Sequence, residues 1–176
     1  MSKPEILAPA GDFTCLQAAI DAGADAVYFG LGTFNMRARS GVNFKVEDLP
    51  EIARRCRRDG GRGLGAEVKR YLTLNAIMFE GEMEEVEQTI VAAKPYVDAF
   101  IVSDIGTVPF LKKNFPDRAL HLSTQASCIN SESAKMYKDM GFERVILGRE
   151  ASISDIKKIK DKVPELELEA FVHGAM

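Results

Sequence analysis

The stretch Asp12-Phe-Thr-Cys-Leu-Gln-Ala-Ala-Ile-Asp-Ala-Gly-Ala-Asp-Ala-Val-Tyr-Phe-Gly30 contains one complete unit of the predicted fold. Asp12 is a typical N-cap residue, and the residues after it place apolar side chains three and four apart, as an amphipathic helix over 13–22 requires. Gly23 is suited to end that helix, because glycine tolerates the left-handed conformation common at helix C-termini. The apolar run 26–29 then predicts a buried strand.

The same alternation recurs along the whole chain. Short apolar runs separated by amphipathic stretches predict seven strands: Glu5–Leu7, Ala26–Phe29, Arg70–Leu74, Ala99–Val102, Ala119–Leu122, Arg144–Leu147 and Leu166–Phe171. All but one of the intervals between strand ends span 20 to 28 residues, which suits a single βα unit. Such units build either an open doubly wound sheet or a barrel, and the spacing alone leaves both open. The first strand is not followed by GxGxxG, so a dinucleotide site is not indicated.

Length and composition limit the class of protein. The 176 residues suit one domain over 1–176, and 46% hydrophobic with 28% charged residues excludes disordered and collagen-like chains. No run reaches the ~20 apolar residues of a membrane span, and the N-terminus lacks a secretory signal pattern, so we expect a cytoplasmic protein with no membrane partner. The three cysteines, Cys15, Cys56 and Cys128, lie far apart without a CxxC, so no metal ligand is predicted. The net charge is −3, but residues 37–70 carry ten Lys or Arg against five Asp or Glu.

Polar side chains follow the predicted strands, at the end of a β/α barrel where active sites lie. The candidate catalytic residues are Glu150, His173 and Arg149, and the candidate substrate-binding residues are Arg37, Arg39, Asn75 and Gln125. Histidine near its usual pKa of ~6.5 serves as acid, base or ligand, although a hydrogen-bonded structural role for His173 remains open. Arg37 and Arg39 lie in a long loop and could either hold an anionic substrate or anchor the loop.

Other polar and thiol groups have simpler interpretations. Arg54–Arg58 is expected to be a solvated helix face that pairs locally with Glu51, with phosphate binding as the alternative. His121 lies within an apolar strand and is expected to be buried. Cys128 would need a nearby base to act as a nucleophile, and the sequence shows none. Cys15 and Cys56 are expected to be small packed side chains of helices.

Several motifs occur in an order that resembles the N-terminal part of peptidase family U32, the collagenase-like proteases. They are Pro4-Glu-Ile-Leu-Ala-Pro-Ala-Gly11, Gly23-Ala-Asp-Ala-Val-Tyr-Phe-Gly30, Phe34-Asn-Met-Arg-Ala-Arg-Ser-Gly41, Tyr71-Leu-Thr-Leu-Asn75, Val102-Ser-Asp104, Leu122-Ser-Thr-Gln-Ala-Ser127, Leu147-Gly-Arg-Glu150 and Glu169-Ala-Phe-Val-His-Gly-Ala-Met176. The resemblance spans the chain. It implies an α/β fold of the TIM-barrel type, here an incomplete barrel of about seven βα units.

The resemblance implies two alternative functions. One is proteolysis of a peptide substrate, with Glu150 or His173 as acid or base and Arg149 as an electrostatic stabiliser. The other is hydroxylation of a tRNA or rRNA pyrimidine with an iron–sulfur cluster. The family pattern continues past Met176 into cysteines that bind the cluster. The chain is therefore expected to be a C-terminally truncated fragment, inactive alone, that binds no cofactor. We expect it to self-associate through an open barrel edge.

Overall fold

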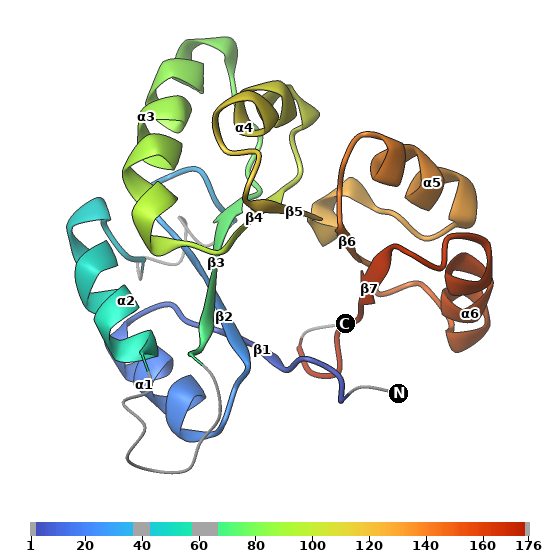
Figure 1. Ribbon diagram of the computed structural model, residues 1–176, viewed down its shortest axis with the longest axis horizontal. Coiled ribbons are helices and arrows are strands. Elements are labelled where there is room, and N and C mark those ends of the chain that lie inside the picture. The colour runs from blue at the N-terminus through green and yellow to red at the C-terminus, as the bar shows by residue number, and fades with distance from the viewer. Residues whose placement is uncertain (1–2, 37–42, 58–66, 175–176) are drawn as a thin grey trace. The chain divides into compact units, whose positions relative to one another are not determined.

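A computed structural model describes residues 3–36, 43–57 and 67–174 (Figure 1). The strands are β1 (Leu7–Pro9), β2 (Ala26–Gly30), β3 (Lys69–Leu74), β4 (Ala99–Val102), β5 (Ala119–Leu122), β6 (Arg144–Ile146) and β7 (Glu167–Glu169). The α-helices are α1 (Phe13–Asp21), α2 (Leu49–Cys56), α3 (Met83–Ala93), α4 (Val108–Asn114), α5 (Ser131–Asp139) and α6 (Ile153–Lys162). Short 3₁₀ helices are η2 (Val46–Asp48), η3 (Glu80–Glu82), η4 (Lys94–Tyr96), η5 (Ile105–Thr107) and η6 (Thr124–Ala126).

The strand order is the order of the sequence, β1 to β7. The pairs β1–β2, β2–β3, β5–β6 and β6–β7 are all parallel. Parallel strands in sequence order, alternating with helices, are the arrangement of a β/α barrel, so the predicted fold class is confirmed. The described residues hold seven strands, one fewer than a closed barrel of this type. Backbone contacts group the chain into two compact units, residues 1–100 and 101–176.

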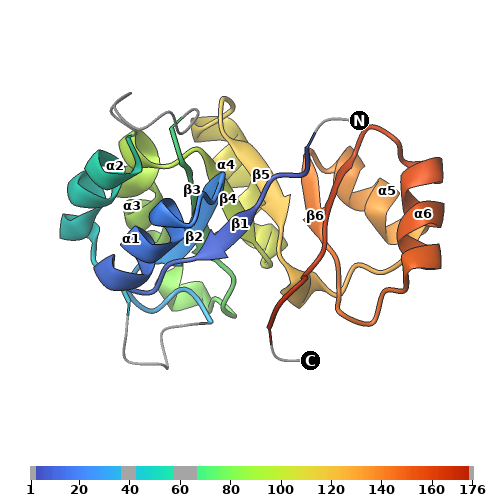
Figure 2. The ribbon, with the colours of Figure 1, turned by 90° about the horizontal axis from the view of Figure 1, so that it is seen from below.

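In the first unit, α1, α2 and α3 lie on one side of β2 and β3 (Figures 1 and 2). The Asp12 carboxylate caps α1 by accepting a hydrogen bond of 2.7 Å from the Cys15 backbone N–H. Leu16 and Ile20 form the buried face of α1, as the apolar spacing predicts. Cys15 lies off that face and is exposed, so the expectation that it packs inside the helix layer is wrong.

Ion pairs fasten the amino ends of the strands in this unit. The Arg70 side chain, at the start of β3, is only 11% exposed and contacts Asp98 (3.2 Å) and Glu67 (3.0 Å). Glu5 accepts from Lys69 at 2.9 Å and from the Tyr71 hydroxyl at 2.9 Å. Apart from the local pair of Arg70 with Glu67, these contacts join segments distant in sequence, but they lie away from the loops that follow the strands.

In the second unit, α5 and α6 lie side by side and cover β6 and β7 (Figures 1 and 2). Arg144 of β6 is buried and pairs with two glutamates of β7, Glu167 at 2.7 Å and Glu169 at 3.4 Å. At the start of α6, Ser152 and Asp155 form a capping box, in which the side chain of each residue accepts a hydrogen bond from the backbone N–H of the other. His121 of β5 is buried, as expected from its apolar strand.

The first and last strands differ most from the sequence prediction, and pairing explains both differences. The first strand is Leu7–Pro9 rather than Glu5–Leu7, because Leu7 pairs with Ala26 and Pro9 with Tyr28. The last strand is only as long as its partner β6. It begins at Glu167, which pairs with Arg144, and ends at Glu169, which pairs with Ile146. Phe171 therefore lies beyond the strand, in the loop. Among the described residues, no helix is long and apolar enough to cross a bilayer.

Candidate functional site

The loops after β6 and β7 meet around Arg149 in the second unit. The starts of the two loops are held side by side, because the Leu147 backbone N–H donates a hydrogen bond of 2.9 Å to the Glu169 carbonyl. The Arg149 guanidinium lies 4.0 Å from the centroid of the Phe171 ring, in a cation–π contact. A Cβ placed on Gly174 would lie 3.9 Å from Nη2 of Arg149, and Gly174 has a φ of +146°, which favours glycine. Arg149 is thus exposed to solvent but held by the loop after β7.

Gly148 brings Glu150 close to the backbone of the same loop. A Cβ on Gly148 would lie 2.7 Å from Oε2 of Glu150 and 2.9 Å from Cγ2 of Ile129. Only glycine therefore leaves room for both side chains where they stand. Glu150 is exposed and has no ion pair with any residue in the described ranges. His173 lies between Phe171 and Gly174 and is also exposed.

The loop after β5 supports the loop after β6. The Thr124 hydroxyl donates to the Leu147 carbonyl at 3.2 Å, and the Gly148 N–H donates to the Cys128 carbonyl at 3.3 Å. Ser127 adopts the left-handed conformation with φ of +52°, and it is the single non-glycine residue in the described segments to do so. Gln125 is exposed in η6, and its backbone N–H donates to the Ser123 hydroxyl at 3.3 Å.

The Cys128 thiol is buried beneath this loop. Desolvation raises its pKa, against a smaller lowering by the hydrogen bond to the Asn130 carbonyl. A raised pKa leaves the thiol protonated and therefore a poor nucleophile. The structure thus agrees with the sequence, which shows no base beside Cys128.

The candidate residues of the first unit form a loop anchor. Asn75, directly after β3, accepts a hydrogen bond of 3.1 Å at Oδ1 from the Met36 N–H, which ties down the loop after β2. Asn35 of the same loop is 2% exposed and donates from Nδ2 to the Leu31 carbonyl at 3.1 Å. Arg37 and Arg39, the predicted anion-binding residues, lie outside the described residues.

The arginine run of α2 makes the local pairs expected from the sequence. Arg54 and Arg55 bind the Glu51 carboxylate at 2.6 Å and 2.7 Å. These hydrogen bonds lower the pKa of Glu51 to about 2. Arg55 also lies 4.6 Å from the centroid of the Phe13 ring. Arg54 and Arg55 are therefore already paired with a carboxylate of their own helix.

The cysteines present do not fit an iron–sulfur cluster. No group of three or more His, Cys, Asp and Glu side chains in the described part of the chain could hold a metal ion. Cys15 is exposed on α1, Cys56 is buried on α2, and Cys128 is buried in the second unit.

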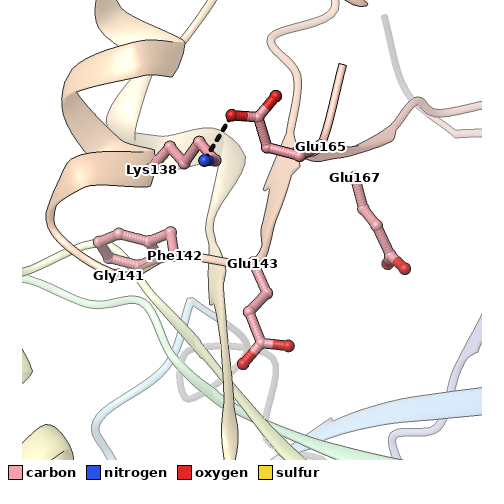
Figure 3. Close-up of a pocket in the computed structure, with 6 residues that line it drawn as sticks. All are labelled: Lys138, Gly141, Phe142, Glu143, Glu165 and Glu167. Atoms are coloured by element: carbon pink, nitrogen blue, oxygen red, sulfur yellow. Dashed lines mark ion pairs between the residues drawn. The ribbon is translucent and has the colours of Figure 1, made fainter. Parts of the chain in front are cut away.

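A cavity of about 410 Å³ lies at the opposite end of β6 and β7 (Figure 3). Its lining residues are Lys138, Gly141, Phe142, Glu143, Glu165 and Glu167. Glu143 and Glu165 precede their strands, so the cavity lies at the amino ends. Lys138 binds Glu165 at 2.5 Å and lowers the pKa of that carboxyl group. Because barrel active sites lie at the carboxyl ends, the Arg149 loops are the better candidate site.

The sequence identifies Arg149 but misses its partner. The apolar run predicts Phe171 as the last residue of the final strand, whereas β7 ends at Glu169. The available signal was its position at the carboxyl side of an apolar run, directly before His173. The structure brings Arg149 and Phe171 together; in the sequence Glu150 follows Arg149 directly, and His173 lies two residues after Phe171. Asn75 belongs to the first unit, and Gln125 extends into solvent from the neighbouring loop of the second.

Comparisons with known proteins agree with the fold and the motifs. Residues 11–176 match the model of Peptidase family U32. The tRNA hydroxylation protein P of Helicobacter pylori is 37% identical over 177 residues, which cover 100% of this chain and 40% of that protein. An uncharacterized protease of Methanocaldococcus jannaschii is 43% identical, over 100% of this chain and 42% of that protein. A solved U32 peptidase has a TM-score of 0.70 at 16% identity and covers 97% of this chain and 69% of its own.

Proposed function

Because this chain belongs to peptidase family U32, we propose that it acts in the hydroxylation of a pyrimidine in tRNA. Its part is to bind and orient the RNA at the carboxyl ends of its strands. The relative named for tRNA hydroxylation aligns with the whole chain, which supports this choice. The chain spans about 40% of the length of that relative. The proposal therefore concerns the binding and orientation of RNA by these residues and not the whole reaction.

The contact between Arg149 and Phe171 carries the proposal. The guanidinium is exposed and has no carboxylate partner among the described residues, so its donors are available to an anion. Proteins recognise RNA with arginines that bind phosphates and with aromatic rings on which bases stack. The nearby Cys128 thiol is buried with a raised pKa, which disfavours nucleophilic attack by it.

Hydroxylation replaces a ring C–H of the pyrimidine by C–OH. The base gains one oxygen atom and loses two electrons, so the reaction needs an oxygen donor and an electron acceptor. The described side chains supply neither, and both must come from outside them. Arg149 and its supporting loops therefore contribute binding energy and orientation, which raise the rate by holding the reacting base in place.

The test is nucleoside mass spectrometry of tRNA from a strain that lacks the gene. We expect hydroxylated pyrimidines to disappear on deletion and to return with the wild-type gene. Arg149→Gln should restore only a small fraction of them. Arg57→Gln is the matched control, because Arg57 is another exposed arginine without an ion pair to a described residue. Unchanged hydroxylated pyrimidines in the deletion strain would refute the proposed function.

Proteolysis is the second candidate, favoured by the relative from M. jannaschii, which is named a protease. In that case Glu150, exposed and next to Arg149, is the proposed acid or base, and His173 is the alternative. Purified protein should release peptides from gelatin, and Glu150→Gln should abolish the release. Glu143→Gln, at the amino end of β6, should leave the release unchanged. Gelatin left intact by clean wild-type protein would exclude this activity on that substrate.

Hydroxylation of tRNA would take place in the cytoplasm under this proposal, since tRNA is processed there. Fractionation of cells that express a tagged protein tests the location. Recovery of the protein together with ribosomes and tRNA would support it, and recovery outside the cell would contradict it.

A further inference from the structure

The Arg149 guanidinium lies over the Phe171 ring and makes no ion pair with any described residue. Phe171 lies against it at 4.0 Å from ring centroid to Cζ, and Gly174 of the same loop lies near Nη2. A guanidinium donates hydrogen bonds in its own plane, so contact with a ring leaves those donors unobstructed. The two-oxygen edge of a phosphate matches the fork of the guanidinium.

We infer that Phe171 is a positioning residue that holds Arg149 to bind a phosphate of the RNA backbone. The inference rests on the proposed function and assigns it a contact and a residue. An exposed arginine side chain loses up to ~2 kcal/mol of rotamer entropy when it is immobilised. The stack on Phe171 restricts the side chain before RNA arrives, so less of that cost falls on binding.

The backbone around Arg149 and Phe171 holds the two loops in a defined conformation. The Leu147 N–H to Glu169 carbonyl bond of 2.9 Å fixes the starting points of the two loops. Gly148 and Gly174 each sit where a side chain is disfavoured, Gly148 by contacts below 3 Å and Gly174 by its φ of +146°. Phe171 is 39% exposed, so much of its surface is covered although it lies outside the strand.

The test is a double-mutant cycle on binding of a fluorescein-labelled tRNA transcript by the purified chain, measured by fluorescence anisotropy across about 50 to 200 mM KCl. Arg149→Gln should reduce the slope of log K against log salt by about 0.7 to 0.9, because one phosphate contact is lost. Phe171→Leu should keep the slope, since the charge remains, and should weaken binding about two- to fivefold.

Coupling separates positioning from a merely structural role. If Phe171 acts through Arg149, Phe171→Leu should have no further effect in the Arg149→Gln background. Phe171→Tyr should bind as the wild type does, because the ring is retained. Phe79→Leu is the control for loss of an exposed ring, since Phe79 is 68% exposed in the first unit. Thermal melts of every variant establish that it is folded.

Three results would overturn the inference. They are additive effects of the two substitutions, an unchanged salt slope in Arg149→Gln, and absence of tRNA binding by the wild type. Additive effects would also be the result if a base stacked directly on Phe171. Failure of this inference can be distinguished from failure of the proposed function. Loss of hydroxylated pyrimidines on deletion together with additive binding effects refutes the positioning role of Phe171 alone. Unchanged pyrimidines together with a coupled cycle refute hydroxylation alone.

Discussion

Replacing Gly30 with alanine puts a methyl group where the Asn35 side chain already lies. The new Cβ would be 2.2 Å from Cγ, 2.3 Å from Oδ1 and 2.5 Å from Nδ2 of Asn35, far inside the ~3.5 Å of van der Waals contact. Asn35 is 2% exposed and donates to the Leu31 and Gly32 carbonyls at 3.1 Å and 3.4 Å. It must therefore leave and give up these bonds. Overpacking costs about 1–3 kcal/mol and lost buried hydrogen bonds about 1–3, so we expect a combined loss of at least about 2 kcal/mol.

The double variant decides whether the clash is the cause. Asn35→Ala alone should cost about 1–3 kcal/mol, and it empties the space that the Gly30→Ala methyl group needs. The double variant should therefore be about as stable as Asn35→Ala, with a coupling of roughly 2 kcal/mol. Urea unfolding followed by circular dichroism and tyrosine fluorescence measures it, since Tyr28, Tyr71 and Tyr96 report on the first unit. With m near ~2 kcal/mol/M, Gly30→Ala should lower the midpoint by at least about 1 M. A loss under about 1 kcal/mol, or additive effects in the double variant, would refute the reasoning.

Three further predictions concern other parts of the chain. The pKa of Glu51 is lowered to about 2 from 4.5, so its pairs with Arg54 and Arg55 stabilise the fold above pH 4.5 and less as the pH falls toward 2. The melting temperature of Glu51→Gln should thus lie below that of the wild type at pH 6 and converge with it near pH 2; equal values throughout would contradict this. Ser152→Ala removes the α6 cap and should lower the melting temperature by a few degrees, whereas Ser152→Asp should largely retain it. Cys15 should react quickly with a thiol reagent in the native protein and the two buried cysteines slowly, as peptide mapping would show; equal rates for all three would argue against the described burial.

Local sequence signals predict most of the fold because the βα unit is a local structure. The apolar runs identify every strand of the described residues, and Asp12 and Ser152 cap the helices that they precede. The strand ends are predicted less well, since they depend on the length of the partner strand. The last strand stops at Glu169 because β6 offers it three residues, a fact that the apolar run up to Phe171 does not contain.

The candidate site was predicted in part, and the missing part is non-local. Arg149 could be found from its place after an apolar strand. Its contact with Phe171 joins residues 22 positions apart and depends on how two loops leave the sheet. The exposure of Cys15 could have been predicted, since it is one residue, or about 100°, from the buried Leu16 on the same helix. Asn75 lies directly after a strand, at the end where substrate-binding residues are expected. Its side chain instead accepts a hydrogen bond from the loop after β2.

The two ends of β6 and β7 differ in electrical character. The residues that line the cavity at the amino ends include three glutamates and a single lysine, and α5 and α6 end on that side. The carboxyl ends carry Arg149, and the helices begin there at the caps Asn130 and Ser152, where the helix dipole is positive. A polyanion that approaches this unit therefore experiences a torque before any contact is made. If RNA binds as proposed, encounters at the carboxyl ends are favoured over those at the glutamate-lined cavity, and this preference should weaken as salt is added.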